Sequence, residues 1–197
     1  APTMVDAASQ LEDFRKPGQA NSRLAAWSPS EPTFRWFKSY LHLAARATPP
    51  PELEVLDSIA RRDLGSPITV SAKSHHDGKL RKFDIDYLLA AEEVCFLANA
   101  VRESGFSSVC EIGAGFGRTA HALLTSHPEI SRYVLLDRPE TLELSRAYLR
   151  QSLSSTLLEK VEFRNALDRS QAPEDVSLWI QIDGFQEMRR NTIREYL

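Results

Sequence analysis

Four residues at alternate positions, Glu111, Gly113, Gly115 and Gly117, form the part of the sequence best suited to hold a ligand. They overlap the end of an apolar run, residues 107–112, that has the character of a buried strand, and a helical pattern follows them. Glycines allow positive φ angles and a close approach of the backbone to a ligand, and the free N–H groups of the next helix attract polar or anionic groups. The arrangement predicts a nucleotide-type cofactor site.

The type of cofactor depends on the sixth position of this glycine pattern. A dinucleotide-binding fingerprint has glycine there, so that the helix can pack closely on the strand, whereas this chain has Arg118. The difference disfavours a nicotinamide-dependent dehydrogenase. A second apolar run, residues 132–136, ends in Asp137. An acid at the tip of the second strand is placed to accept hydrogen bonds from the hydroxyls of a ribose.

The pattern Glu-x-Gly-x-Gly-x-Gly at 111–117 resembles motif I of class I S-adenosylmethionine-dependent methyltransferases. Two further stretches are similar to the sugar O-methyltransferases found in bacterial polysaccharide and natural-product gene sets. They are Asp-Arg-Pro-Glu-Thr-Leu at 137–142 and Phe-Gln-Glu-Met at 185–188. The turn at 64–67 resembles a Gly-Asn-Pro turn of that family, although Ser66 replaces the asparagine and Arg138 replaces an aliphatic residue. The resemblance covers roughly residues 60–197.

The resemblance implies an α/β fold with a Rossmann-like core of the class I methyltransferase type over residues 105–197. A helical or cap region over residues 1–104 precedes it. Alternating strand and helix patterns from Ser107 onward independently favour a parallel sheet covered by helices. Four strands are expected, at 107–112, 132–136, 160–164 and 176–182. The family core has further strands, so we expect a core truncated after its fourth strand, whose exposed edge would favour association.

The remaining pattern predicts helices and irregular segments. Helices are expected at 34–47, from 51 or 52 to about 64, at 84–103, 117–126, 139–152 and 185–197, with a short turn near 166–170. Residues 1–33 are expected to form an irregular or partly helical arm, and residues 68–82 an irregular basic loop that could fold over the site.

The resemblance also implies which residues contact the cofactor. Glu111 would accept a hydrogen bond from the methionine ammonium, directly or through water, and Asp137 would bind the ribose diol. Arg138 would either flank the adenine or be solvated. Asp168 would either meet the adenine amino group or cap a turn. The complete set of expected cofactor-binding residues is Glu111, Gly113, Ala114, Gly115, Gly117, Asp137, Arg138 and Asp168.

Methyl transfer from a sulfonium requires the chain to align the acceptor oxygen and to exclude water, and a general base helps because a sugar hydroxyl is weakly acidic. The candidate catalytic residues are Asp183, Glu187, His75 and His76. Each also has a plainer interpretation. Asp183 could simply open a loop, Glu187 could interact with a helix dipole, and the two histidines could be solvated. The sequence contains no zinc or calcium ligand spacing, so metal independence is expected.

Composition restricts the class of protein further. The chain has 42% hydrophobic and 26% charged residues, as is usual for a soluble globular protein, and its net charge of -3 offers no footprint for nucleic acid. No apolar run approaches the roughly 20 residues that span a bilayer, and the first residues lack the pattern of a signal peptide. Cys95 and Cys110 are expected to be buried free thiols, which favours a reducing, cytoplasmic location.

Together these observations predict an S-adenosylmethionine-dependent O-methyltransferase that acts on a hydroxyl of a sugar or glycosylated metabolite. Two alternatives stay open. The chain could methylate another small-molecule oxygen or nitrogen acceptor, or it could be a non-catalytic methyltransferase-like module that binds a partner. The N-terminal helices would either cap the active site or mediate formation of a homodimer.

Overall fold

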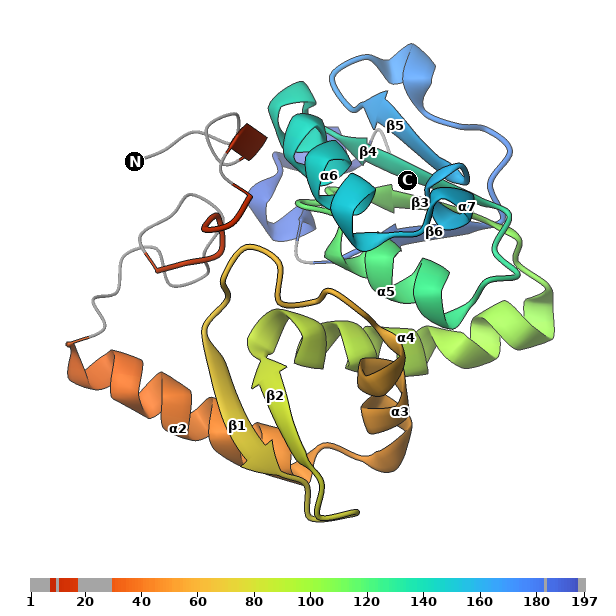
Figure 1. Cartoon of the computed structure of the whole chain (residues 1–197). Coiled ribbons are helices and arrows are strands. Elements are labelled where there is room, and N and C mark those ends of the chain that lie inside the picture. Colours follow the sequence, from red (N-terminus) through yellow and green to blue (C-terminus); the bar gives the residue numbers. More distant parts are fainter. Residues whose placement is uncertain (1–7, 10, 18–29, 183, 195–197) are drawn as a thin grey trace.

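Figure 1 shows a computed structural model of the chain, which describes residues 8–9, 11–17, 30–182 and 184–194, with the backbone alone at 99–104, 169 and 187. The helices are α2 (Pro32–Ala47), α3 (Pro50–Ser58), α4 (Ile85–Ser104), α5 (Arg118–Ser126), α6 (Pro139–Ser152), α7 (Ser155–Leu158) and α8 (Arg190–Arg194). The strands are β1 (Thr69–Lys73), β2 (Leu80–Asp84), β3 (Ser108–Ile112), β4 (Arg132–Asp137), β5 (Val161–Asn165) and β6 (Leu178–Gln181). Two short 3-10 turns are η1 (Arg169–Gln171) and η2 (Phe185–Glu187).

Strands β3 to β6 form a parallel sheet in the order β5-β4-β3-β6. The chain enters the sheet at β3, moves outward through α5 to β4 and through α6 to β5, and then returns to the other side of β3 as β6. This topology confirms the Rossmann-like core, and the four strands lie close to their predicted positions. The change of direction between β3 and β6 is a topological switch point, and ligands of such sheets bind outside the carboxyl ends of the strands at that point.

The two faces of the sheet are covered differently. Helices α4, α5 and α6 pack on one face, where they meet buried side chains such as Val109, Leu135 and Ile180. The opposite face carries a smaller buried cluster that includes Cys110 and Val134. Loop residues pack against this second cluster, namely Ala166, Ala172, Val176, Phe185 and Met188.

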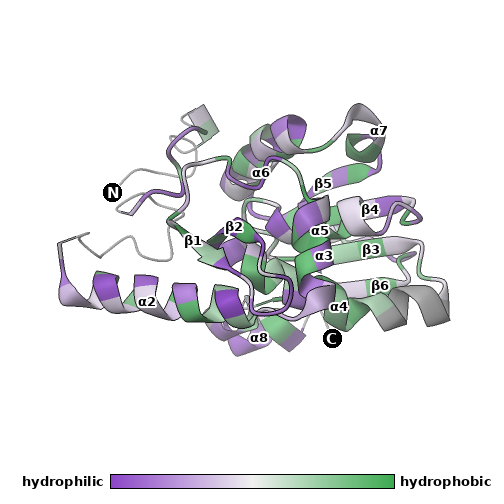
Figure 2. Ribbon diagram, turned by 60° about the horizontal axis from the view of Figure 1, so that its bottom comes forward, coloured by the Kyte–Doolittle hydropathy of each residue, from purple (hydrophilic) through white to green (hydrophobic). Residues whose placement is uncertain are grey.

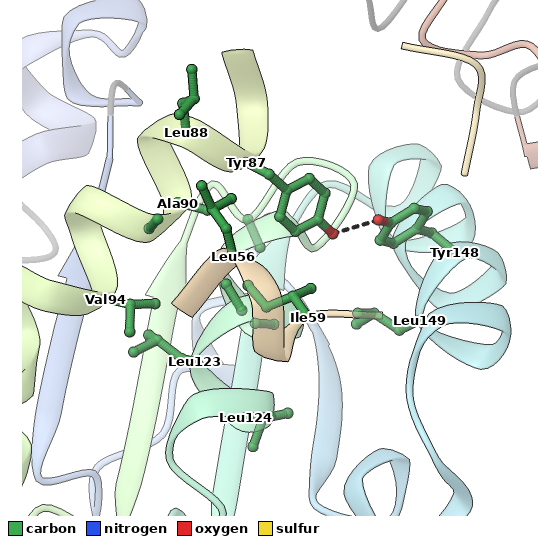
Figure 3. Close-up of a cluster of buried hydrophobic side chains, with 14 of the residues drawn as sticks. Leu56, Ile59, Tyr87, Leu88, Ala90, Val94, Leu123, Leu124, Tyr148 and Leu149 are labelled. Atoms are coloured by element: carbon green, nitrogen blue, oxygen red, sulfur yellow. Dashed lines mark hydrogen bonds between the residues drawn. The ribbon is translucent and has the colours of Figure 1, made fainter. Parts of the chain in front are cut away.

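Helix α4 packs against both α3 and α5. Tyr87 of α4 points toward Tyr148 of α6, and their hydroxyl oxygens are 2.5 Å apart (Figure 3). The Tyr87 hydroxyl also lies 2.5 Å from Nδ1 of His121 in α5. Burial lowers the pKa of His121 to about 4, so its imidazole is neutral near pH 7. These hydrogen bonds connect three helices inside an apolar cluster.

The N-terminal elements share this core. Helix α2 packs against β1 and buries Phe34, Leu41 and Ala45, and Figure 2 shows hydrophilic and hydrophobic residues alternating along it. One buried cluster includes Phe14 and Leu41 together with Val109 of the sheet. The hydrophobic core is therefore continuous across residue 105, where the sequence suggested a domain boundary.

The predicted second helix is too long. Helix α3 ends at Ser58 and not near Leu64. Ile59 instead adopts an extended conformation and buries its side chain, and the Arg62 guanidinium donates a hydrogen bond to the carbonyl oxygen of Leu56. These contacts satisfy a helix-end carbonyl with a side chain and so end the helix.

Residues 68–82 were expected to be an irregular loop, and this prediction is wrong, because β1 and β2 form an antiparallel hairpin. The available signal was Asp77-Gly78, since this dipeptide is typical of hairpin turns, and Gly78 has a φ of 67°. Arg81 strengthens the hairpin through ion pairs of 2.7 Å with Asp77 and with Asp57.

At the C-terminal end, η1 takes the place of the turn expected near 166–170, and η2 and α8 divide the expected helix 185–197. The part of that prediction beyond Arg194 lies outside the described residues. Strand β6 borders the sheet in the part of the chain that the structure describes. A cavity of about 410 Å³ lies beside it, lined by Glu92, Glu93, Phe96, Leu97 and residues 179–182. Among the described helices, none combines the length and apolar character that a bilayer crossing needs.

Candidate cofactor site

The turn between β3 and α5 holds its three glycines in left-handed conformations, with φ angles of 75° at Gly113, 57° at Gly115 and 90° at Gly117. The sequence predicted positive φ angles at these positions. The Gly113 N–H donates to the carbonyl oxygen of Leu136 at 2.9 Å, and the Gly117 N–H donates to that of Ala114 at 3.0 Å. The turn is therefore held against the carboxyl end of β4.

The three glycines differ in the space around them. A Cβ atom built on Gly115 would have no neighbour within 4 Å, and one on Gly113 would lie 4.0 Å from the Cα of Gly184. A Cβ atom on Gly117 would lie 3.0 Å from two side-chain carbons of Leu149 in α6. Gly113 and Gly115 thus leave room for a ligand against the backbone, whereas Gly117 lets α6 pack against the turn.

Helix α5 begins at Arg118, so the N–H groups of its first turn lie at the glycine turn. The Arg118 side chain binds α4 instead of the turn. It donates to the carbonyl oxygen of Asp86 at 2.9 Å and forms a 2.5 Å ion pair with Glu93. The sequence offers no clear signal for this role of Arg118, which was not predicted.

Asp137, at the end of β4, is hydrogen-bonded to the glycine turn. Its Oδ2 atom accepts from the Gly115 N–H at 2.9 Å, and its Oδ1 atom accepts from the Arg138 N–H at 2.7 Å. Burial raises the pKa of this carboxyl group, and the two backbone hydrogen bonds oppose the shift. The Thr141 side chain also hydrogen-bonds this carboxylate, and a ligand hydroxyl could use the acceptor capacity that remains. The structure thus brings together the turn and the acid, while ribose binding by Asp137 stays a prediction.

Glu111 is buried below the turn and is only 3% exposed. Its Oε2 atom accepts a hydrogen bond from the Tyr133 hydroxyl at 2.9 Å. Burial raises the pKa of Glu111 to about 7, while the Tyr133 hydroxyl, Arg118 and Thr119 lower it. These internal contacts are sufficient to position Glu111, and its binding of a methionine ammonium group stays a prediction.

Arg138 and Asp168 lie at the same carboxyl edge but have local partners. The Arg138 side chain is 68% exposed and lies 3.8 Å from the carboxylate of Glu140. The Asp168 carboxylate accepts from the N–H and hydroxyl groups of Ser170, at 3.1 and 2.7 Å, and from Nε2 of Gln171 at 2.9 Å. These hydrogen bonds lower the pKa of Asp168 and fit a turn-capping acid. The proposed contacts of both residues with adenine stay predictions.

Leu167 is a further candidate, which the sequence pattern did not predict. Its side chain is 69% exposed, and the N–H of the preceding Ala166 donates to the carbonyl oxygen of Asp137 at 2.8 Å. An exposed leucine beside the Asp137 backbone offers an apolar surface for a flat ring. Nothing in the sequence distinguishes it from other leucines in loops.

The loop that follows β6 borders the glycine turn. A Cβ atom on Gly113 would lie 4.0 Å from Gly184 Cα and from Met188 Cε. Asp183 itself lies outside the described residues, and Glu187 is described by its backbone alone, in η2. The position of this loop suits residues that act on an acceptor, and the catalytic roles of Asp183 and Glu187 stay predictions.

The structure does not bring His75 and His76 to this site. Both lie at the tip of the β1–β2 hairpin, where the His75 N–H donates to the carbonyl oxygen of Arg46 and the His76 N–H donates to Ser74 Oγ. Strand β2 runs five residues, about 16 Å, from this tip to Asp84. The hairpin ladder and the contact with α2 therefore replace the loop that was expected to fold over the glycine turn.

Within the ranges that the structure describes, no group of three or more His, Cys, Asp or Glu residues is placed to hold a metal ion. Cys95 and Cys110 are free thiols, and only Cys110 is fully buried. Burial raises the pKa of Cys110 to about 12, so this residue is a thiol and not a thiolate near pH 7.

No protein-family model and no curated protein matches the chain. Among solved structures, the methyltransferase domain of bacterial CtHen1 is 13% identical, with a TM-score of 0.47 over 55% of this chain and 57% of that chain. The mitomycin 7-O-methyltransferase MmcR is 18% identical, with a TM-score of 0.42 over 56% of this chain and 32% of that chain.

A methyltransferase of Podospora anserina, PaMTH1, bound to S-adenosylhomocysteine (SAH), is 15% identical, with a TM-score of 0.43 over 86% of this chain and 64% of that chain. The chain spans 57% and 32% of the first two proteins. Similarities of this size do not distinguish one activity from another, so function must be argued from the site.

Proposed function

We propose that this chain binds S-adenosylmethionine at the glycine turn and transfers the methyl group to a hydroxyl of a sugar or glycosylated metabolite. The observation that carries the proposal is the 2.9 Å hydrogen bond between the Gly115 N–H and the Asp137 carboxylate. It joins a backbone that can approach a ligand to an acid suited to ribose hydroxyls. The open space beside Gly113 and Gly115 supports the same conclusion.

When bound, the cofactor supplies a methyl group already activated on a sulfonium. The backbone of residues 113–117 and the first turn of α5 bind its polar groups, and Asp137 orients its ribose. The loop at 183–188 holds the acceptor hydroxyl in line with the methyl group and excludes water. Asp183 or Glu187, in that loop, takes the proton from the acceptor hydroxyl.

The class of acceptor rests on the resemblance of residues 137–142 and 185–188 to the sugar O-methyltransferases. Another small-molecule oxygen or nitrogen acceptor would use the same cofactor-binding residues. Assays with different acceptors must therefore decide between these alternatives. We also propose that residues 1–104 cap the active site or mediate formation of a homodimer. The free thiols of Cys95 and Cys110 support a location in the cytoplasm.

Calorimetric titration tests the cofactor. We expect S-adenosylmethionine and SAH to bind with micromolar affinity and NAD to bind far more weakly. Asp137→Asn should weaken the binding of S-adenosylmethionine and of SAH by about tenfold to a hundredfold, because it removes a charged acceptor of hydrogen bonds. The control is Asp175→Asn, because the Asp175 side chain is 79% exposed and pairs only with Arg132 in the described ion pairs.

Equal binding of NAD, or full affinity in Asp137→Asn, would contradict the proposal. If the cofactor binds, release of SAH is then measured with glycosylated metabolites and with their aglycones. Turnover with the aglycones alone would reject the sugar acceptor and leave the methyltransferase assignment in place. Binding without turnover on any acceptor would favour the partner-binding module.

A further inference from the structure

A segment far from the glycine turn in sequence is docked beside it. In residues 11–17, Phe14 is 1% exposed and Arg15 is 3% exposed. The Arg15 N–H donates to the carbonyl oxygen of Gly65 at 2.8 Å, and its guanidinium donates to the carbonyl oxygens of Arg62 and Leu64 at 2.7 and 3.1 Å. The sequence predicted only an irregular or partly helical arm for this segment.

Two carboxylates make the docking of Arg15 specific. Its guanidinium lies 2.5 Å from Asp84 and 2.9 Å from Asp86, at the junction of β2 and α4. Asp84 is only 3% exposed. A buried carboxylate without a partner is costly, so the N-terminal segment supplies a charge that the folded chain requires at this position.

The same two residues contact the glycine turn through Phe116. The Phe14 and Phe116 rings meet edge to face with centroids 5.4 Å apart, and the Arg15 guanidinium carbon lies 5.3 Å from the Phe116 centroid. Phe116 stands between Gly115 and Gly117, which both have positive φ angles. Because a ring between two such residues moves with their backbone, contacts that hold Phe116 also hold the turn.

We propose that residues 11–16 are a positioning element of the cofactor site. In the docked state, Phe14 and Arg15 hold Phe116 and so keep the backbone of the glycine turn in the conformation that binds the cofactor. This inference rests on the proposed function for the identity of the ligand. Docking and cofactor binding are then linked, and by reciprocity each favours the other to the same extent.

The first test compares two substitutions of buried phenylalanines. Phe14→Leu removes the ring that touches Phe116, whereas Phe83→Leu alters an equally buried ring in β2, since both are 1% exposed. We expect Phe14→Leu to raise the Kd for SAH at least about tenfold and Phe83→Leu to change it less than about twofold. The increases in Kd that Phe14→Leu and Phe116→Leu cause should not add in the double variant, because each substitution removes the same contact between the two rings. If Phe14→Leu and Phe83→Leu change the Kd equally, Phe14 contributes only as a core residue and the inference is overturned.

Hydrogen exchange gives a readout that does not need a ligand. The Gly115 N–H is bonded to Asp137 and the Gly117 N–H to Ala114, so both amides are expected to be protected. In the unliganded protein, Phe14→Leu should speed their exchange, and Phe83→Leu should leave it unchanged. Unchanged exchange in Phe14→Leu would overturn the inference.

The reverse direction of the linkage is tested by trypsin, which can cleave after Arg15 only when the segment undocks. SAH should slow this cleavage, and NAD should not. If the wild-type protein binds no SAH, the proposed function fails, while the exchange experiment still decides whether the segment positions the turn. Binding of SAH with cleavage at an unchanged rate would overturn the linkage alone.

Discussion

Replacement of Glu111 by glutamine is expected to stabilise the protein at alkaline pH more than at acidic pH. Glu111 is 3% exposed, and its carboxylate accepts a 2.9 Å hydrogen bond from the Tyr133 hydroxyl. A glutamine carbonyl oxygen has the same shape and can accept the same bond, but it carries no charge. The substitution therefore removes the cost of a buried charge and leaves the packing in place.

The magnitude follows from the pKa of Glu111, which burial raises from 4.5 to about 7. Because the pKa is higher in the folded state, the contribution of Glu111 to stability is complete below pH 4.5 and is lost as the pH rises through about 7. A shift of this size corresponds to about 3 kcal/mol. The stability advantage of Glu111→Gln over the wild type should therefore grow by about 3 kcal/mol between acidic and mildly alkaline pH.

Urea unfolding of both proteins, near pH 4.5 and near pH 8, measures this change. Glu162→Gln is the control, because ion pairs with Arg132 and Arg164 lower the pKa of Glu162. Its stability relative to the wild type should not rise between pH 4.5 and pH 8, because a lowered pKa confines the effect of Glu162 to pH values near and below 4.5. A constant difference between Glu111→Gln and the wild type at both pH values would refute the reasoning that burial controls Glu111.

Three further substitutions test the residues in and around the glycine turn. Gly117→Ala should lower the free energy of unfolding by at least about 1–2 kcal/mol, measured by urea unfolding, because φ is 90° and the new Cβ atom would lie 3.0 Å from Leu149. Arg118→Met should cost about 2 kcal/mol in the same measurement, because Glu93 would lose its ion pair. Asp168→Ala should change the calorimetric Kd for SAH less than about threefold, because its hydrogen bonds are local; a larger loss would instead support adenine binding.

The sheet and the pair of Gly115 and Asp137 could be predicted because their signals are local. A run of β-branched residues predicts a strand, alternate glycines predict a turn with positive φ, and an acid directly after the next strand must lie at the same edge of a parallel sheet. The relation of β3 to β4 then follows from chain connectivity. No contact between distant residues is needed to make these predictions.

The roles of other residues depend on such distant contacts and could not be predicted. Glu111 is held by a hydrogen bond from the Tyr133 hydroxyl on the neighbouring strand, and burial in the folded core raises its pKa. His75 lies away from the site because a hairpin packs on α2. Phe14 is buried because Phe116 and Tyr148 provide a surface for its ring. In each case the deciding partner comes from a different element, which the local pattern does not specify.

The cofactor half and the acceptor half of the candidate site are held by different elements. Substitutions in the two halves should therefore change different kinetic and binding constants. The cofactor half is held by Asp137 from β4, by the Arg118–Glu93 ion pair from α4 and by Phe14 from the N-terminal segment. The acceptor half rests on the loop after β6, a strand at the border of the described sheet. Because a loop can change its contacts without disturbing the core, substitutions at 184–188 should alter kcat and acceptor choice, whereas substitutions in the cofactor half should alter cofactor affinity.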